Sequence, residues 1–506
     1  MRTSPAPNPA VGRNRPRGTA VAVCALCALV ILGVLAVGST SGILLLLAAA
    51  AVLFAVCAVI SPVFVAAVFL VTLFFRLPIK DMVGALPIEV FWLMFAGLAG
   101  AAVLWMARTP DRLRGIGGVE WAMAGYLAWN YYSMLAPHQY AEGSPLTAGA
   151  LPIPRFIFVG TVIPFALYMI GRYTFDRERK VRILLWMILA FATYSAAVSI
   201  MPSVGLGGWV WPQYIVTEVR PSWSGRAVGI FNQPVANGMV LSLGFAVAMV
   251  LANRRKDPAW QRFAALAVAI AAGCGLFFTH TRAVWLSGVV VLLIGAVLAK
   301  GHRKGFVAIL VALGATVALN WSSFTSADRG SGGVGSDVEV QSRLNDMMTA
   351  LWAFTQRPID GWGIGRFQSI NSYHHKQWSP DTPWSAGWGE ASHENELAIL
   401  AELGLIGLTA WVCVLVFIGS RLWRAYRTVP DDELCGKPLV LMAMMAGAIF
   451  LCAGLTVDLR YFDFATAIIF LLVGVAVGWA DRYAAATTVA VLDTRFDGLP
   501  RLEAAR

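Results

Sequence analysis

The chain has 506 residues, of which 58% are hydrophobic and 13% are charged, and its mean hydropathy is +0.68. This composition excludes an ordinary soluble domain and indicates a helical protein with many membrane-spanning segments. The net charge of +11 could belong to a nucleic-acid-binding patch, but the basic residues are spread over alternate loops between apolar runs. That distribution is typical of cytoplasmic loops, so we expect a lipid bilayer, and no nucleic acid, as a partner.

Apolar runs follow one another along most of the chain. Since a hydrocarbon core about 30 Å thick needs roughly 20 helical residues per crossing, we predict an all-α polytopic transmembrane helical bundle of about 14 spans (12–14). The candidate runs lie near residues 19–39, 42–60, 62–77, 87–106, 118–134, 155–171, 183–200, 228–251, 263–278, 283–299, 305–320, 396–419, 438–457 and 464–480. The third and fifth of these are short for a complete crossing.

The runs divide the chain into five consecutive segments. These are a cytoplasmic disordered tail at 1–18, spans 1–11 at 19–320, a large external loop at 321–395, spans 12–14 at 396–480 and a second cytoplasmic tail at 481–506. The first apolar run is too long for a typical cleaved signal, so we expect an uncleaved span. Six of the seven cysteines lie inside apolar runs and the seventh lies in a cytoplasmic loop, so no disulfide framework is predicted.

Histidine is concentrated on the predicted external face. The external histidines are His138, His280, His374, His375 and His393, whereas His302 is cytoplasmic. A purely structural membrane protein gives no reason for this sorting. No carboxylate or cysteine at ligand spacing completes a zinc site with the external histidines, and adjacent histidines point apart on an extended chain, so we predict no metal site.

The large external loop contains one clear helical pattern. From Ser342 to Gln356 apolar residues recur at helical spacing, which predicts an amphipathic helix lying along the membrane surface. Pro358 is expected to end it. The glycine-rich stretch 361–365 then predicts a turn that lets the backbone approach a neighbour closely.

The next span opens with an unusual number of ionisable residues. Ser392 is a plausible N-cap for a helix beginning at His393, and Glu394 and Glu396 would then lie in a first turn, where acids are favoured at the water boundary. Glu402 lies more than two turns deeper, where an acid needs a partner or a water-filled cavity. It is either a hydrogen-bonding residue inside the bundle or part of a polar substrate path.

Two external arginines are candidates for binding phosphate, because a planar guanidinium donates bidentate hydrogen bonds and keeps its charge. Arg226 precedes the eighth apolar run, and Arg282 lies in a tight turn between the ninth and tenth. The alternative for both is that they extend toward lipid headgroups, which is common near helix ends.

Three segments, in this order, resemble the O-antigen ligase and polymerase superfamily of bacterial envelope glycan enzymes. They are Arg226 with Gly229-Ile-Phe-Asn-Gln-Pro234, Thr281-Arg282-Ala-Val-Trp285, and a block in which Pro358–Phe367 is followed by His393-Glu-Asn395 and Gly404-Leu-Ile-Gly407. The resemblance covers roughly residues 220 to 410. The sequence departs from the family pattern at Glu394, which stands where Asn is usual, at Thr281, which replaces Ser, and at Ala283, which replaces Gly.

The resemblance implies a membrane glycosyltransferase of the O-antigen ligase type in the bacterial cytoplasmic membrane, with both termini in the cytoplasm and an external active site. The donor would be a glycan on undecaprenyl diphosphate, and the acceptor a hydroxyl of a glycan or lipid-linked glycan. Arg282 and Arg226 would bind the diphosphate. His393 would be the base of an inverting transfer that needs no metal and no cofactor.

The resemblance also suggests supporting residues. Glu394 or Glu396 could orient the His393 ring, and Asn395 stands beside them. The residues that could line a sugar groove are Glu402, Arg366, Asp458 and Arg460.

Three alternatives remain open at this stage. A polymerase of the same superfamily would carry the same motifs. A transporter or flippase of lipid-linked saccharides would also have many spans, although no internal repeat relates the two halves of the sequence. A scaffolding membrane protein would explain the spans but neither the arginine turn nor His393.

Overall fold

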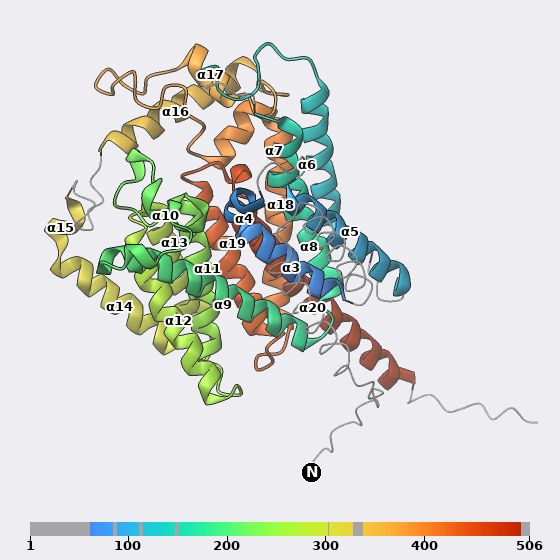
Figure 1. The fold of residues 1–506 in the computed structure, drawn as a ribbon. Coiled ribbons are helices and arrows are strands. Elements are labelled where there is room, and N and C mark those ends of the chain that lie inside the picture. The colour runs from blue at the N-terminus through green and yellow to red at the C-terminus, as the bar shows by residue number, and fades with distance from the viewer. Residues whose placement is uncertain are drawn as a thin grey trace, which may run out of the picture.

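The computed structural model describes residues 61–83, 89–110, 115–146, 151–301, 303–326 and 337–496. Within these ranges every regular element is a helix and none is a strand (Figure 1), which confirms the all-α prediction. The expected runs at 19–39 and 42–60, and the tail at 1–18, lie outside the described residues.

The long helices are α3 (Pro62–Phe74), α4 (Arg76–Val83), α5 (Val90–Arg108), α6 (Gly118–Leu135), α7 (Ile153–Ile157) continued by the π-helix η2 (Phe158–Val162) and α8 (Ile163–Thr174), α9 (Glu178–Ile200), α11 (Pro234–Ala252), α12 (Ala259–Phe278), α13 (Arg282–Leu298), α14 (Arg303–Leu319), α16 (Asp337–Gln356), α17 (Phe367–His374), α18 (Asn395–Thr428), α19 (Lys437–Gly454) and α20 (Asp463–Phe496). Short helical turns are η3 (Met201–Val204), η4 (Gly207–Trp209), α10 (Tyr214–Thr217), η5 (Pro221–Trp223), η6 (Gly229–Phe231), α15 (Trp321–Thr325) and η7 (Leu459–Tyr461).

Eight helical segments of the described chain are long and apolar enough to cross a membrane. A ninth is added if α3 and α4, which meet at a bend of 74°, form one broken span. The expectation of about 14 spans is therefore not confirmed. Helices do cover the predicted runs at 118–134, 283–299 and 305–320, but α13 and α14 have 17 residues each, the lower limit for one crossing.

Helix α11 lies at the centre of the bundle. Its apolar window is 94% buried inside the protein, compared with 28% for the neighbouring α12, so most of α12 faces away from the rest of the protein. Helices α8 and α20 approach most closely through the Gly474-x-x-x-Gly478 pair. A Cβ atom on Gly474 would lie 2.1 Å from the carbonyl oxygen of Tyr168, so only glycine permits this crossing.

A cap formed by α16, α17 and the surrounding loops covers one end of the bundle (Figure 1). The amphipathic helix predicted at 342–356 is present as α16, which begins at Asp337 and ends at Gln356. Its apolar side contributes Ala350 and Ala353 to a second small core with Trp362 and Phe367. The cap is thus held to the bundle by its own hydrophobic cluster.

Helix α18 is interrupted at Gly404, whose φ of 64° and ψ of −164° are accessible only to glycine. The freed carbonyl oxygen of Glu402 accepts a hydrogen bond of 2.8 Å from the Gly363 N–H, and the freed N–H of Leu405 donates at 2.8 Å to the Pro358 carbonyl. The glycine-rich segment that follows α16 therefore fills the break and satisfies its polar groups. This confirms the close backbone approach predicted for residues 361–365.

Candidate functional site

A cavity of about 840 Å³ opens between the cap and the nearest helix ends. We call it the Arg–His cavity. Its ionisable lining residues are Arg76, Arg220, Arg226, Arg343, Glu339, Glu390, His393, Asp458 and Asp463. They come from the α3–α4 bend, the segment before α11, the start of α16, the loop before α18 and the α19–α20 connection. Helix ends far apart in sequence thus build one polar chamber of the size typical for ligand sites.

Arg226 lies in the cavity with its side chain 8% exposed and paired with the Glu339 carboxylate of α16. Local backbone structure fixes this position. The Gln233 side chain caps α11 by accepting from the N–H groups of Val235 and Ala236, and Pro234 occupies the first helical turn, where proline is tolerated. The motif Gly229–Pro234 therefore places Arg226 at the start of the most buried helix.

The second arginine motif lies beside the first. The Ala227 N–H donates a hydrogen bond of 2.8 Å to the Phe278 carbonyl at the end of α12, immediately before the turn that carries Arg282. Thr281 lines the cavity, whereas Arg282, the first residue of α13, is not among the lining residues. The structure thus brings the backbones of the two predicted segments together and puts Arg226, but not the Arg282 side chain, on the cavity wall.

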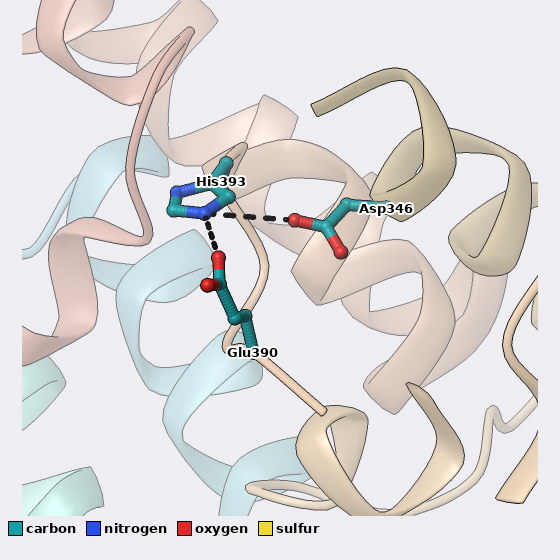
Figure 2. Close-up of side chains that lie close together, drawn as sticks. All are labelled: Asp346, Glu390 and His393. Atoms are coloured by element: carbon teal, nitrogen blue, oxygen red, sulfur yellow. Dashed lines mark hydrogen bonds and ion pairs between the residues drawn. The ribbon is translucent and has the colours of Figure 1, made fainter. Parts of the chain in front are cut away.

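His393 also lines the cavity, and two carboxylates converge on one of its ring nitrogens (Figure 2). Its Nε2 lies 2.9 Å from Oε2 of Glu390 and 3.7 Å from Oδ2 of Asp346. The hydrogen bond from His393 holds the pKa of Glu390 below its ordinary value. Burial raises the pKa of Asp346 well above its ordinary value, and the nearby Glu390 charge adds to this effect.

The contact with Glu390 favours one tautomer of His393. A carboxylate accepts hydrogen bonds, so this contact suits the tautomer that carries the hydrogen on Nε2 and the lone pair on Nδ1. A histidine with this arrangement can accept a proton at Nδ1 while Glu390 stabilises the charge that forms.

The same three residues have the spacing of a divalent-cation site. One ligand atom from each of Asp346, Glu390 and His393 can be chosen so that all lie within 4.8 Å of one another, and Asp346 is buried. Oxygen and imidazole ligands suit several divalent metals. Sequence reasoning predicted no metal site and did not consider this group, because its members come from two segments more than 40 residues apart.

The residues directly after His393 have structural partners. Helix α18 begins at Asn395, so the predicted N-cap at Ser392 was wrong by two positions, and the Ser392 hydroxyl instead bonds the backbone of Glu394. Asn395 Oδ1 accepts from the Leu459 N–H at 3.1 Å, and Glu396 accepts from the Asn395 side chain at 3.1 Å. None of Glu394, Asn395 and Glu396 lines the Arg–His cavity. The carboxylate that contacts the His393 ring belongs to Glu390 and not, as expected, to Glu394 or Glu396.

The deeper charged residues form a buried network. Arg460, with a side chain 5% exposed, lies 2.7 Å from Asp458 and 2.8 Å from Glu402. Glu402 also accepts from the Phe367 N–H at 2.9 Å. Arg366 donates to the Tyr140 and Ile364 carbonyls and pairs with Glu142. Of these predicted groove residues only Asp458 lines the cavity.

Several cavity residues were missed by sequence reasoning. They are Arg76, Arg220, Arg343, Glu339, Glu390 and Asp463. Asp346, which lies near His393 without lining the cavity, was missed as well. Arg220 lies six residues before Arg226, and Arg343 lies on the predicted amphipathic helix. No local pattern identifies the others, because their roles arise only when the α3–α4 bend and the cap meet.

A comparison with known families finds one similarity, which covers part of the chain. Residues 265–412 match the family described as O-antigen ligase. This segment includes the Arg282 turn, the cap and His393, and it ends within α18. No individual curated protein matches the chain. The family that residues 265–412 match is the one that the sequence motifs of this multi-pass helical protein resemble.

Proposed function

We propose that the protein transfers a glycan from undecaprenyl diphosphate to an acceptor hydroxyl at the outer face of a bacterial cytoplasmic membrane, as an O-antigen ligase would. The observation that carries this proposal is the convergence of Arg226, His393 and three further arginines on one cavity. In this proposal the site faces outward and both termini lie in the cytoplasm.

The proposed reaction uses the two sides of the cavity differently. His393 Nδ1 takes the proton from the acceptor hydroxyl as the acceptor oxygen forms a bond to the anomeric carbon. The bond from that carbon to the diphosphate breaks, and the diphosphate leaves with the electron pair. Attack opposite the leaving group inverts the anomeric centre.

Guanidinium groups stabilise the charge that develops on the leaving diphosphate. Arg226 is the principal candidate, since its side chain is largely buried at the cavity wall. Arg282 directly follows the cavity residue Thr281, and we propose it as the second diphosphate-binding arginine. Arg76, Arg220 and Arg343 add positive charge to the same chamber.

Charge neutralisation by arginine is the basis for proposing a metal-independent transfer. In this account Asp346 and Glu390 position the imidazole of His393. Glu402 and Arg460 have a structural role in this proposal, since their buried ion pair lies next to the cavity residue Asp458.

The reaction class can be tested with purified protein in vesicles that contain undecaprenyl-diphosphate-linked glycan and an acceptor glycan. We expect free undecaprenyl diphosphate and a new glycosidic bond. A transporter or flippase would leave the donor chemically unchanged, and that result would refute the proposal.

The second candidate, a polymerase, shares this chemistry and differs in acceptor. A strain that lacks the gene distinguishes the two. Loss of a ligase leaves long chains on the lipid carrier, whereas loss of a polymerase leaves single repeats.

A further inference from the structure

A second polar cavity, of about 470 Å³, lies at the other end of the same helices. It is lined near the end of α11 by Val250, at the end of α13 by Leu298 and at the start of α19 by Lys437. The Arg–His cavity is lined by the start of α11 and by residues that directly precede α13 and follow α19. Since α11 has 19 residues, the two cavities are separated by roughly 28 Å of helix, about one hydrocarbon thickness.

The lining of this second cavity combines positive charge with an apolar wall. Its charged residues are Arg254, Arg255, Lys256, Lys300, Lys437, Asp431 and Asp432, and its apolar residues include Val250, Leu298, Phe306 and Leu441. Five cations face two acids, so the cavity carries an excess of positive charge. The apolar residues belong to helix ends, at the level where a bilayer meets water.

The cations are not all neutralised by protein groups. Arg254 pairs with Asp257 at 3.0 Å, Lys437 pairs with Asp431, and Lys256 lies 3.6 Å from Asp432. Among the described residues, no carboxylate lies within ion-pair distance of Arg255 or Lys300, and both are exposed at the cavity. Two available cations in one concave site are suited to a phosphate-bearing ligand.

We propose that this cavity binds the phosphate headgroup of an anionic phospholipid. Arg255 and Lys300 would contact the phosphate, and the apolar wall would lie against the upper part of the acyl chains. The charge excess selects an anion, and the apolar residues at helix ends favour a membrane lipid over a free inorganic anion. The site lies at the far ends of α11, α13, α18 and α19 from His393 and does not depend on the reaction proposed for it.

The test uses the full chain in detergent, with phosphatidylglycerol, phosphatidylcholine or inorganic phosphate added, and it measures the shift in melting temperature. We expect a saturable rise with phosphatidylglycerol only. Replacing Arg255 and Lys300 with glutamine should weaken the apparent affinity by about fivefold for each cation removed. A matched control replaces Arg303 and Lys304, which are exposed nearby but do not line the cavity, and should keep the wild-type affinity.

Three results would overturn the proposal. Phosphatidylcholine could raise the melting temperature as much as phosphatidylglycerol, inorganic phosphate could do so at the same concentration, or the Arg255→Gln/Lys300→Gln variant could respond like the wild type. A charge-conserving variant, Arg255→Lys/Lys300→Arg, distinguishes a lost site from a damaged fold. It should keep most of the lipid response, and its failure to do so would also count against the proposal.

Discussion

The Nε2 atom of His393 lies 2.9 Å from a carboxylate oxygen of Glu390, three residues earlier in the chain. This contact orients the ring and leaves Nδ1 as the nitrogen that can accept a proton. The pairing also assigns the orienting role to an acid that precedes the histidine and not to one that follows it.

Replacing Glu390 with glutamine should lower the turnover number by roughly 10- to 100-fold, because the amide keeps the hydrogen-bonding shape but loses the charge that stabilises protonated histidine. Initial rates of undecaprenyl diphosphate release in vesicles would measure this. Asp381→Asn, an exposed change in the same cap, serves as the control. Should Glu394→Gln prove the more damaging change, the assignment of Glu390 would be wrong.

Metal removal tests whether Asp346 and Glu390 orient the His393 imidazole or bind a metal ion together with it. We expect turnover to stay within about twofold after prolonged treatment with a chelator, because arginines supply the positive charge. Activity should be assayed before and after chelation and again after Mg²⁺ or Mn²⁺ is added back. A loss that either ion restores would mean that the group binds a catalytic metal.

The break in α18 should depend on its glycine. In a Gly404→Ala variant the new Cβ atom would lie 2.3 Å from the Ile359 carbonyl oxygen at a positive φ, so we expect a loss of about 3 kcal/mol or more in unfolding free energy. Gly419→Ala in the same helix meets no atom within 4 Å and should change stability by about 1 kcal/mol or less. Thermal denaturation followed by size-exclusion chromatography compares the two. Equal melting temperatures would argue against the broken helix.

Much of the fold followed from the sequence, and the reasons for the failures are physical. Apolar runs located most of the long helices outside the cap because burial in lipid depends on composition. The span count did not follow, because a run such as that of α13 does not reveal whether a 17-residue helix crosses completely. The break at Gly404 required knowledge of a segment 40 residues away that fills it.

The sequence predicted only some of the residues that form the candidate site. Arg226 and His393 were found because their residue types and motifs suit the chemistry, and both line the cavity. Arg76 and Asp346 were not found, because single charged residues acquire a role only when distant elements meet. Arg460 and Glu402 are of residue types that could bind a sugar, but in the structure their side chains form an ion pair with each other inside the protein.

The cap should loosen in acid. Burial holds the pKa of His138, His374 and His375 below the ordinary value near 6.5. Because the folded-state pKa values are lowered, the stability that these neutral histidines contribute is present above about pH 6.5 and is lost as the pH falls through the lowered values. The protection factors of the amides in residues 337–394, which correct hydrogen exchange for its intrinsic pH dependence, should therefore be lower at pH 5 than at pH 7.5.

His375 gives a specific version of that test. Its Nδ1 lies 2.6 Å from Asn371 Oδ1, and its buried Nε2 has no hydrogen-bond partner among the described residues, so adding a proton there is costly. A His375→Gln variant should show a smaller acid effect in the cap, with α20 as the internal reference. An unchanged acid effect would place the sensitivity elsewhere.

The central claim is that the Arg–His cavity is where the glycan is transferred. The most direct measurement is the initial rate of undecaprenyl diphosphate release by His393→Ala and Arg226→Ala variants at membrane levels equal to the wild type. We expect each rate to fall by at least about 100-fold, whereas Arg427→Ala, an exposed change at the opposite end of α18, should retain the wild-type rate. Wild-type release by the His393→Ala variant would contradict the account.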